Sequence, residues 1–170
     1  MMNERSTLIV RRALPTDLSA LLQVFAAARR YMVETGNPHH WKSDYPSETL
    51  LLSQIHAGYC RVVVSEDAGV VGTFCLIPGE DPTYAHIEGK WLNSFPYATI
   101  HRLASNGMVS GVADACLNYC ALLYPNLRID THADNHVMQK WLARTGFIYC
   151  GVIHVADGSP RRAYQRYIEK

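Results

Sequence analysis

Ile100–Leu123, with the sequence IHRLASNGMVSGVADACLNYCALL, contains a strand, a turn and a helix in direct succession. Its first six residues predict a β-strand. Asn106-Gly107 tolerates positive φ and marks a tight turn after that strand. From Val112 onward, apolar residues recur at helical spacing to the end of the segment. The centre of the chain therefore predicts a strand that runs through a loop of small residues into a helix.

The start of this helix is a candidate anion site. Its first backbone N–H groups have no intrahelical acceptor, and the helix dipole adds partial positive charge there. A phosphate fits such a position. Gly111 and Ala113 lack side-chain bulk and would let a phosphate approach the main chain closely. The same residues also suit an ordinary strand, loop and helix joint, so the residues alone leave both interpretations open.

Length and composition predict one globular domain over residues 1–170. The chain is 48% hydrophobic and 18% charged, without repeats, linkers or low-complexity segments. Its formal net charge of +1 argues against a nucleic-acid partner. The basic pairs Arg11-Arg12, Arg29-Arg30 and Arg161-Arg162 are predicted to lie on solvated faces.

The cysteines and the N-terminus indicate the expected compartment. Only Leu8–Val10 is apolar near the N-terminus, so we expect neither a signal peptide nor a membrane span. The five cysteines are odd in number and lie mostly in apolar runs, as buried reduced thiols do. A cytoplasmic protein without a membrane partner is the expectation.

The remaining periodicity predicts the element order β-α-α-β-β-β-α-β-α-β-β. Beside the central strand and helix, the predicted strands are 7–13, 60–65, 70–77, 126–132, 148–155 and 162–168. The predicted helices are 15–36, 48–55 with Ser47 as N-cap, and one capped by Asp134 or Asn135 and ended by Gly146. Residues 36–46 and 80–96 are predicted to be loops.

Both long loops carry large aromatic side chains. Trp41 and Tyr45 lie in the first loop, and Tyr84 and Trp91 lie in the second. Such rings either close the edge of a core or line a pocket, because cores and pockets are both rich in aromatic residues. We take Trp41, Tyr84 and Trp91 as candidate substrate-binding residues, with core packing as the alternative.

Two motifs resemble those of the GNAT superfamily of N-acetyltransferases. Met108-x-x-Gly111-x-Ala113 resembles its Q/R-x-x-G-x-G/A signature, in which backbone amides hold the pyrophosphate of acetyl-CoA. Met108 stands where the family usually has Arg or Gln, which affects a side-chain contact. The segment Asn135–Phe147 resembles the family's N-x(10)-G-F pattern.

The resemblance covers nearly the whole chain and implies a fold. That fold is α/β of the α+β kind: a mixed, mostly antiparallel sheet, splayed between its fourth and fifth strands and flanked by helices. It also implies acetyl-CoA as co-substrate, with no metal. Asn135 would reach the pantetheine arm or a bridging water, unless it serves only as a helix cap. The other residues implied to bind acetyl-CoA are Leu103, Ala104, Ser105, Met108, Val109, Ser110, Gly111, Val112 and Ala113.

The implied reaction is acetylation of a primary amine, on a small molecule or an amino acid, by direct attack in a ternary complex. The amine must be neutral, because an ammonium has no lone pair, so a proton acceptor is needed. His101 on the central strand is the candidate base and Glu88 a weaker rival. The family's usual acid, a tyrosine, is replaced by Leu142, and we assign no acid although Tyr149 lies nearby.

Other classes of function stay open. Leu142 and Met108 favour a non-catalytic acyl-CoA-binding or sensor module, which would bind acetyl-CoA without consuming it. A zinc site is the other rival, because Asp130, His132, Asp134 and His136 lie close together in sequence. A nucleotide-binding P-loop is excluded, since no Gly-Lys-Ser/Thr follows the loop. Exposed strands at the end of such a fold often pair, so a homodimer is possible.

Overall fold

The computed structural model describes residues 7–41 and 44–169. In these residues, eight strands form one sheet in the order β1-β2-β3-β5-β6-β8-β7-β4. The strands are β1 Leu8–Arg12, β2 Cys60–Ser65, β3 Gly69–Pro78, β4 Glu88–Gly89, β5 Ala98–Ser105, β6 Asn126–Thr131, β7 Ile148–His154 and β8 Pro160–Tyr167. The α-helices are α1 Leu18–Glu34, α2 Glu48–His56, α3 Val112–Leu123 and α4 His136–Arg144.

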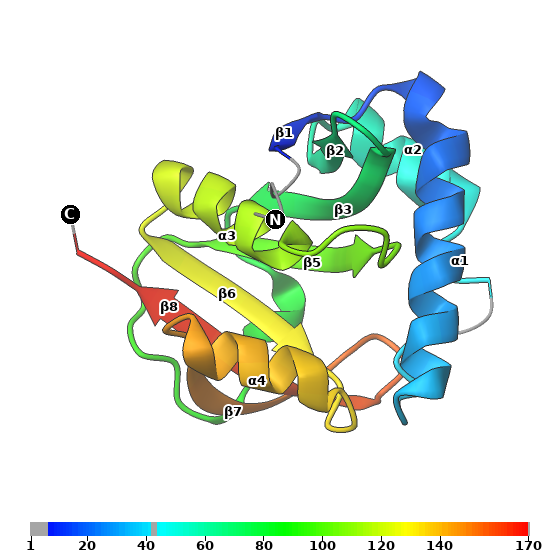
Figure 1. Ribbon diagram of the computed structural model, residues 1–170. Coiled ribbons are helices and arrows are strands. Elements are labelled where there is room, and N and C mark those ends of the chain that lie inside the picture. The colour runs from blue at the N-terminus through cyan, green and yellow to red at the C-terminus, as the bar shows by residue number, and fades with distance from the viewer. Residues whose placement is uncertain (1–6, 42–43, 170) are drawn as a thin grey trace, which may run out of the picture.

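The sheet is mixed and mostly antiparallel, as the family resemblance implied. Only β5 and β6 run parallel, and they pair at just two positions, Ala98 with Leu127 and Thr99 with Arg128. Beyond these positions the two strands separate, and Figure 1 shows them diverging towards α1. The predicted splay is therefore present. The fourth and fifth predicted strands are β5 and β6 in the structure. Their numbers are one higher because the two-residue β4, which has no sequence periodicity, precedes them in the chain.

A bulge in β5 lies beside the splay. Arg102 has φ of 52°, in the left-handed region that residues other than glycine rarely adopt. The register with β3 shifts at the same place, between Thr73 and Cys75. A bulge bends its strand and turns side chains in new directions. In this sheet the bulge lies in the part of β5 that no longer pairs with β6.

The helices cover both faces of the sheet (Figure 1). Phe74 on β3 packs with Cys116 of α3 and Leu142 of α4. Its neighbour Cys75 points to the opposite face and packs with Leu21 of α1, as the alternation of side chains along a strand requires. Each face of the sheet thus has its own apolar core.

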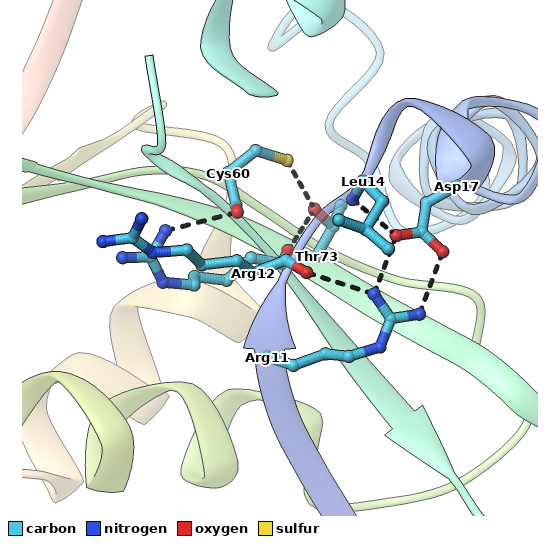
Figure 2. A network of polar contacts seen from close by, with 7 residues as sticks. Arg11, Arg12, Leu14, Asp17, Cys60 and Thr73 are labelled. Carbon is cyan, nitrogen blue, oxygen red and sulfur yellow. Dashed lines mark hydrogen bonds and ion pairs between the residues drawn. The ribbon is translucent and has the colours of Figure 1, made fainter. Parts of the chain in front are cut away.

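Local capping explains where two helices begin. Ser47 Oγ accepts from Leu50 N at 3.1 Å, as predicted for the N-cap of α2. The predicted helix 15–36 instead starts with a 3-10 turn, η1 Pro15–Asp17, before α1. Asp17 Oδ2 accepts from Leu14 N at 2.7 Å across this turn, a contact drawn in Figure 2.

The same carboxylate holds an ion pair with β1. Both terminal nitrogens of Arg11 donate hydrogen bonds to the Asp17 carboxylate, at 2.8 and 3.0 Å (Figure 2). This hydrogen bonding lowers the pKa of Asp17 below its ordinary value. The side chain therefore ties the end of the first strand to the start of α1.

The cysteines are reduced and buried, as their apolar surroundings predicted. Cys60, Cys75, Cys116, Cys120 and Cys150 are all free thiols. In the part of the chain that the structure describes, no helix has the length and apolarity needed to span a membrane.

Candidate functional site

A cavity of about 890 Å³ opens where β5 and β6 separate. Residues 100–105 of β5 line one side and residues 129–131 of β6 line the other. The first turn of α3, one face of α4, the inner side of α1 and the turn between β7 and β8 complete the wall. The sheet therefore opens into a cleft through the separation of two parallel strands.

Six of the residues predicted to bind the cofactor line this cavity: Leu103, Ala104, Ser105, Val112, Ala113 and Asn135. The first three lie on β5 beyond its last pair with β6. The edge of β5 that faces the cavity therefore has no strand partner there. An extended ligand can add to such an edge through main-chain hydrogen bonds.

The other four predicted cofactor residues, Met108, Val109, Ser110 and Gly111, do not line the cavity. They form the turn that leads into α3. Gly111 is the N-cap of this helix, with φ of 94°, and Met108 is 70% exposed. The turn thus ends beside the cavity, where the first backbone N–H groups of α3 have no intrahelical acceptor.

Asn135 serves as a helix cap and also lies at the cavity. Its Oδ1 accepts from Met138 N at 3.1 Å, which makes it the N-cap of α4, and it also lines the cavity. Lys140 and Arg144, further along the same face of α4, add positive charge to the wall. Sequence analysis missed these two cations. Their helical spacing from Val137 was a signal that could have found them.

Trp41 and Tyr45 line the far part of the cavity, together with α1. Trp41 also packs edge-on against Phe25 of the core, with ring centroids 5.4 Å apart. Trp41 thus both packs against the core and lines the cavity. Tyr45 OH accepts from Arg102 at 3.2 Å, which fixes the loop next to the β5 bulge.

Tyr84 and Trp91, also candidate substrate-binding residues, are not part of the cavity wall. Tyr84 is only 2% exposed, and its ring packs against Trp91 at 5.2 Å. Trp91 Nε1 donates to the Tyr84 carbonyl, and the Arg128 guanidinium lies 4.0 Å from the Trp91 ring. These rings fold the long loop back onto the sheet, which their residue types alone could not reveal.

His101 lines the cavity and is paired with a carboxylate. Its Nε2 lies 2.8 Å from Asp81 Oδ2, and this hydrogen bond lowers the pKa of Asp81. Asp81 is held in turn by Thr83 N, which donates to Oδ1, and by Tyr97 OH, which accepts from Asp81 N. With Nε2–H donating to Asp81, the neutral ring has its lone pair on Nδ1.

A second acidic group, Asp130 on β6, reaches the same part of the cavity. Tyr84 OH donates to Asp130 Oδ2 at 2.5 Å, and the Tyr84 ring lies 6.3 Å from the His101 ring. Burial raises the pKa of Asp130 above its ordinary value, although the Tyr84 hydrogen bond acts in the opposite direction. Sequence analysis considered Asp130 only as a metal ligand.

Two arginines that sequence analysis did not assign to the site also line the cavity. Arg102 has a buried Nε without a hydrogen-bond partner in the described structure. Arg161 was predicted to be solvated, but it is only 8% exposed. It donates to the carbonyl oxygens of His40 and Pro160, both at 3.1 Å. Arg161 thus turns inward from the strand, whereas Arg162 lies over the Tyr149 ring at 4.2 Å.

The remaining candidates lie away from the cavity. Glu88 is exposed on β4 and pairs with Val152. Leu142 is fully buried in the core, and Tyr149 is 45% exposed beside Arg162.

The candidate zinc ligands do not converge on one point. His132 Nδ1 accepts from Asp134 N at 3.0 Å, which uses this ring nitrogen in a turn. Among residues 7–41 and 44–169, no three His, Cys, Asp or Glu side chains gather as a metal site would require.

No protein-family model matches the sequence, and no curated protein matches it. Solved structures do match. The crystal structure of a GNAT family acetyltransferase from Streptococcus agalactiae is 32% identical, with 96% of each chain covered and a TM-score of 0.85. A GNAT family acetyltransferase from Listeria monocytogenes is 18% identical, with 95% of each chain covered and a TM-score of 0.69. An agmatine N-acetyltransferase is 14% identical, with 95% and 99% covered and a TM-score of 0.61.

Proposed function

Because the chain belongs to the GNAT family of acetyltransferases, we propose that it moves the acetyl group of acetyl-CoA to a primary amine. The acceptor is a small molecule or an amino acid, and it attacks directly in a ternary complex. The observation that carries this proposal is the cavity at the splay, which extends from the first turn of α3 to His101. The agmatine N-acetyltransferase, similar in fold, acts on a small amine.

The wall of the cavity suits acetyl-CoA. The unpaired edge of β5 at Leu103, Ala104 and Ser105 would bind the pantetheine arm. The N–H groups at the start of α3 would hold the pyrophosphate. Thr131 Oγ1 is buried in the wall without a hydrogen-bond partner in the described structure. It would therefore be available to form a hydrogen bond with a bound ligand.

His101 would act as the base. Bound acetyl-CoA supplies the acetyl group as a thioester, and the acceptor amine must lose its proton to attack it. His101 Nδ1 would take that proton, directly or through water, because Nε2 is occupied by Asp81. Asp81 thereby fixes the ring and stabilises the imidazolium that forms. We assign no general acid, since a CoA thiol leaves readily as a thiolate.

Calorimetric titration with acetyl-CoA, followed by an amine screen for released thiol, tests the proposal. We expect one acetyl-CoA bound per chain and thiol release with at least one amine. Binding without turnover for any amine would favour the alternative, a non-catalytic acyl-CoA-binding module, for which Leu142 is the supporting observation. A folded protein that binds no acetyl-CoA would contradict both functions.

A pair of α3 variants tests where acetyl-CoA binds. Ala113→Glu places a carboxylate in the cavity wall beside the start of α3, where it would repel the phosphates. We expect acetyl-CoA affinity to fall about tenfold or more. Asn118→Glu adds the same charge on the exposed side of α3 and serves as the control. Equal affinity of both variants and wild type in the calorimeter would contradict the placement.

Compartment and assembly complete the proposal. The five free, buried thiols support a reducing compartment, and we propose the cytoplasm.

A homodimer is supported by exposed apolar side chains at the end of the sheet, Ile148, Tyr149 and Ile168. Light scattering of the purified protein tests the dimer, and a monomeric mass would contradict it.

A further inference from the structure

Two opposite charges face the acceptor part of the cavity from neighbouring strands. Asp130 on β6 pairs with Ala163 on β8, and Arg161 lies two residues before Ala163 on the same face. Residues at such diagonal positions lie about 7–8 Å apart, with their Cβ atoms somewhat closer. Both residues line the cavity, yet they form no ion pair with each other.

No carboxylate among the described residues forms an ion pair with Arg161, although its charge acts on Asp130 from a distance. Its side chain donates to two main-chain carbonyls, those of His40 and Pro160, and to no carboxylate. A guanidinium has several N–H donors, so these two bonds leave others available. Taking a charge out of water without a counter-ion costs free energy. A buried cation of this kind in a ligand cavity indicates a site for a negatively charged group.

Asp130 lies at the reacting end of the same space. Its partner Tyr84 stacks beside His101, the proposed base. A carboxylate here would attract the ammonium of an incoming acceptor before His101 receives its proton. The cavity therefore offers a negative group beside the base and a positive group one diagonal step away.

We propose that the acceptor is an amino acid or a closely related zwitterion. Arg161 binds its carboxylate, and Asp130 binds its ammonium beside His101. An α-amino acid carries these two charges a few ångströms apart, so one molecule can reach both side chains. The inference rests on the acetyltransferase function proposed above and adds the chemical class of the acceptor.

A panel of matched acceptors tests this assignment on the intact protein. The panel contains the common L-amino acids, their α-amides and their decarboxylated amines, and thiol release from acetyl-CoA gives kcat/KM. The best amino acid should exceed its own amide and amine by about 30-fold or more, since losing the partner of a buried charge costs roughly 2 kcal/mol or more. This comparison needs no variant.

Arg161→Gln tests the residue itself. We expect this variant to lose about 30-fold or more in kcat/KM for the amino acid and to change little with the amide, so that the preference disappears. Arg162→Gln is the control, because Arg162 lies over Tyr149 outside the cavity. Unchanged acetyl-CoA affinity shows that the variant is folded, and Arg161→Lys, which keeps the charge, should restore part of the preference.

The outcomes separate this inference from the function on which it rests. Amides or simple amines used as well as the amino acids would overturn the inference and leave the acetyltransferase intact. An acid preference that survives Arg161→Gln would also overturn it, because the carboxylate would then bind elsewhere. If the protein binds acetyl-CoA but releases no thiol with any acceptor, the proposed function fails and the inference fails with it.

Discussion

At the scale of single residues, the His101–Asp81 pair is the feature with the clearest chemical consequence. Its 2.8 Å contact holds the ring in the cavity wall and leaves Nδ1 as the proposed proton acceptor. Asp81 belongs to an irregular loop, so no sequence periodicity connected it to His101. The pair exists only because the loop folds back against β5.

Replacing His101 should affect turnover more than binding. A positioned general base contributes about 10²–10⁴-fold to rate, so His101→Ala should lower kcat by that factor while acetyl-CoA affinity stays the same. Steady-state kinetics with thiol detection measure the effect. Glu88→Gln is the control, because Glu88 is exposed on β4. A His101→Ala variant as active as wild type would mean that bound water suffices.

Asp81 should act through His101 as a positioning residue. Asp81→Asn keeps a hydrogen-bonding side chain but removes the charge that stabilises a protonated ring. We expect kcat to fall about tenfold and the pH–rate profile to move to lower pH, since the imidazolium form of His101 then has no carboxylate to stabilise it. A merely structural role for Asp81 would lower stability and leave the profile in place.

We expect the carboxylate of Asp130 to lower the stability of the folded protein at neutral pH and to contribute to its activity. Burial raises the pKa of Asp130, so the folded state binds its proton more tightly than the unfolded state, and the ionised carboxylate costs stability above pH about 4. Asp130→Asn removes that cost and can still accept from Tyr84. The variant should have an unchanged or higher Tm at pH 7, no gain near pH 3, and a lower kcat/KM. A clear fall in Tm at pH 7 would contradict this account.

At the scale of elements, β5 determines the site. It pairs with β6 over two residues, bulges at Arg102, and ends in the turn before α3. Along this part of its length, β5 borders the cavity instead of pairing with β6. This is why one strand contributes to the proposed base and to the proposed sites for the pantetheine arm and the pyrophosphate.

The start of α1 gives an element-scale prediction. Asp17 accepts from Leu14 N and from Arg11, and the second contact lowers its pKa. A lowered carboxyl pKa contributes stability at neutral pH, which is lost as the pH falls below the ordinary value near 3.8. Asp17→Asn should therefore lower the free energy of unfolding by about 1 kcal/mol at pH 7.

Urea denaturation of this variant at pH 7 and at pH 3 checks the sign. The difference from wild type should shrink at the lower pH, because below the ordinary pKa near 3.8 the unfolded carboxyl takes up a proton. Glu66→Gln removes an exposed carboxylate from the β2–β3 turn and controls for net charge. A difference that grows at low pH would contradict the assignment.

The predictability of the elements follows from the range of the interactions that form them. Ser47 and Asn135 cap helices through contacts three residues away; Ser47 was predicted from the sequence, and Asn135 was one of the two caps predicted for α4. The inward turn of Arg161 depends on a contact with His40, far away in the chain. The burial of Tyr84 depends on Asp130 in the same way. Local patterns carry no information about such pairs.

At the scale of the whole molecule, the main feature of the sheet is the gap between β5 and β6. Two apolar cores, one on each face, hold β5 and β6 while their main chains separate. The 32% identity to the Streptococcus agalactiae enzyme over 96% of the chain places this architecture in the GNAT family. The two sequence motifs lie at α3 and α4, on either side of the cavity.

The central claim is that acetyl-CoA lies in the gap between β5 and β6. Hydrogen exchange of the backbone amides, with and without saturating acetyl-CoA, tests it most directly. We expect slower exchange at Leu103–Ser105 and in the first turn of α3, with little change at the β1–β2 edge of the sheet. Binding that leaves the amides of β5 and α3 unchanged, or protects a different edge, would contradict the account.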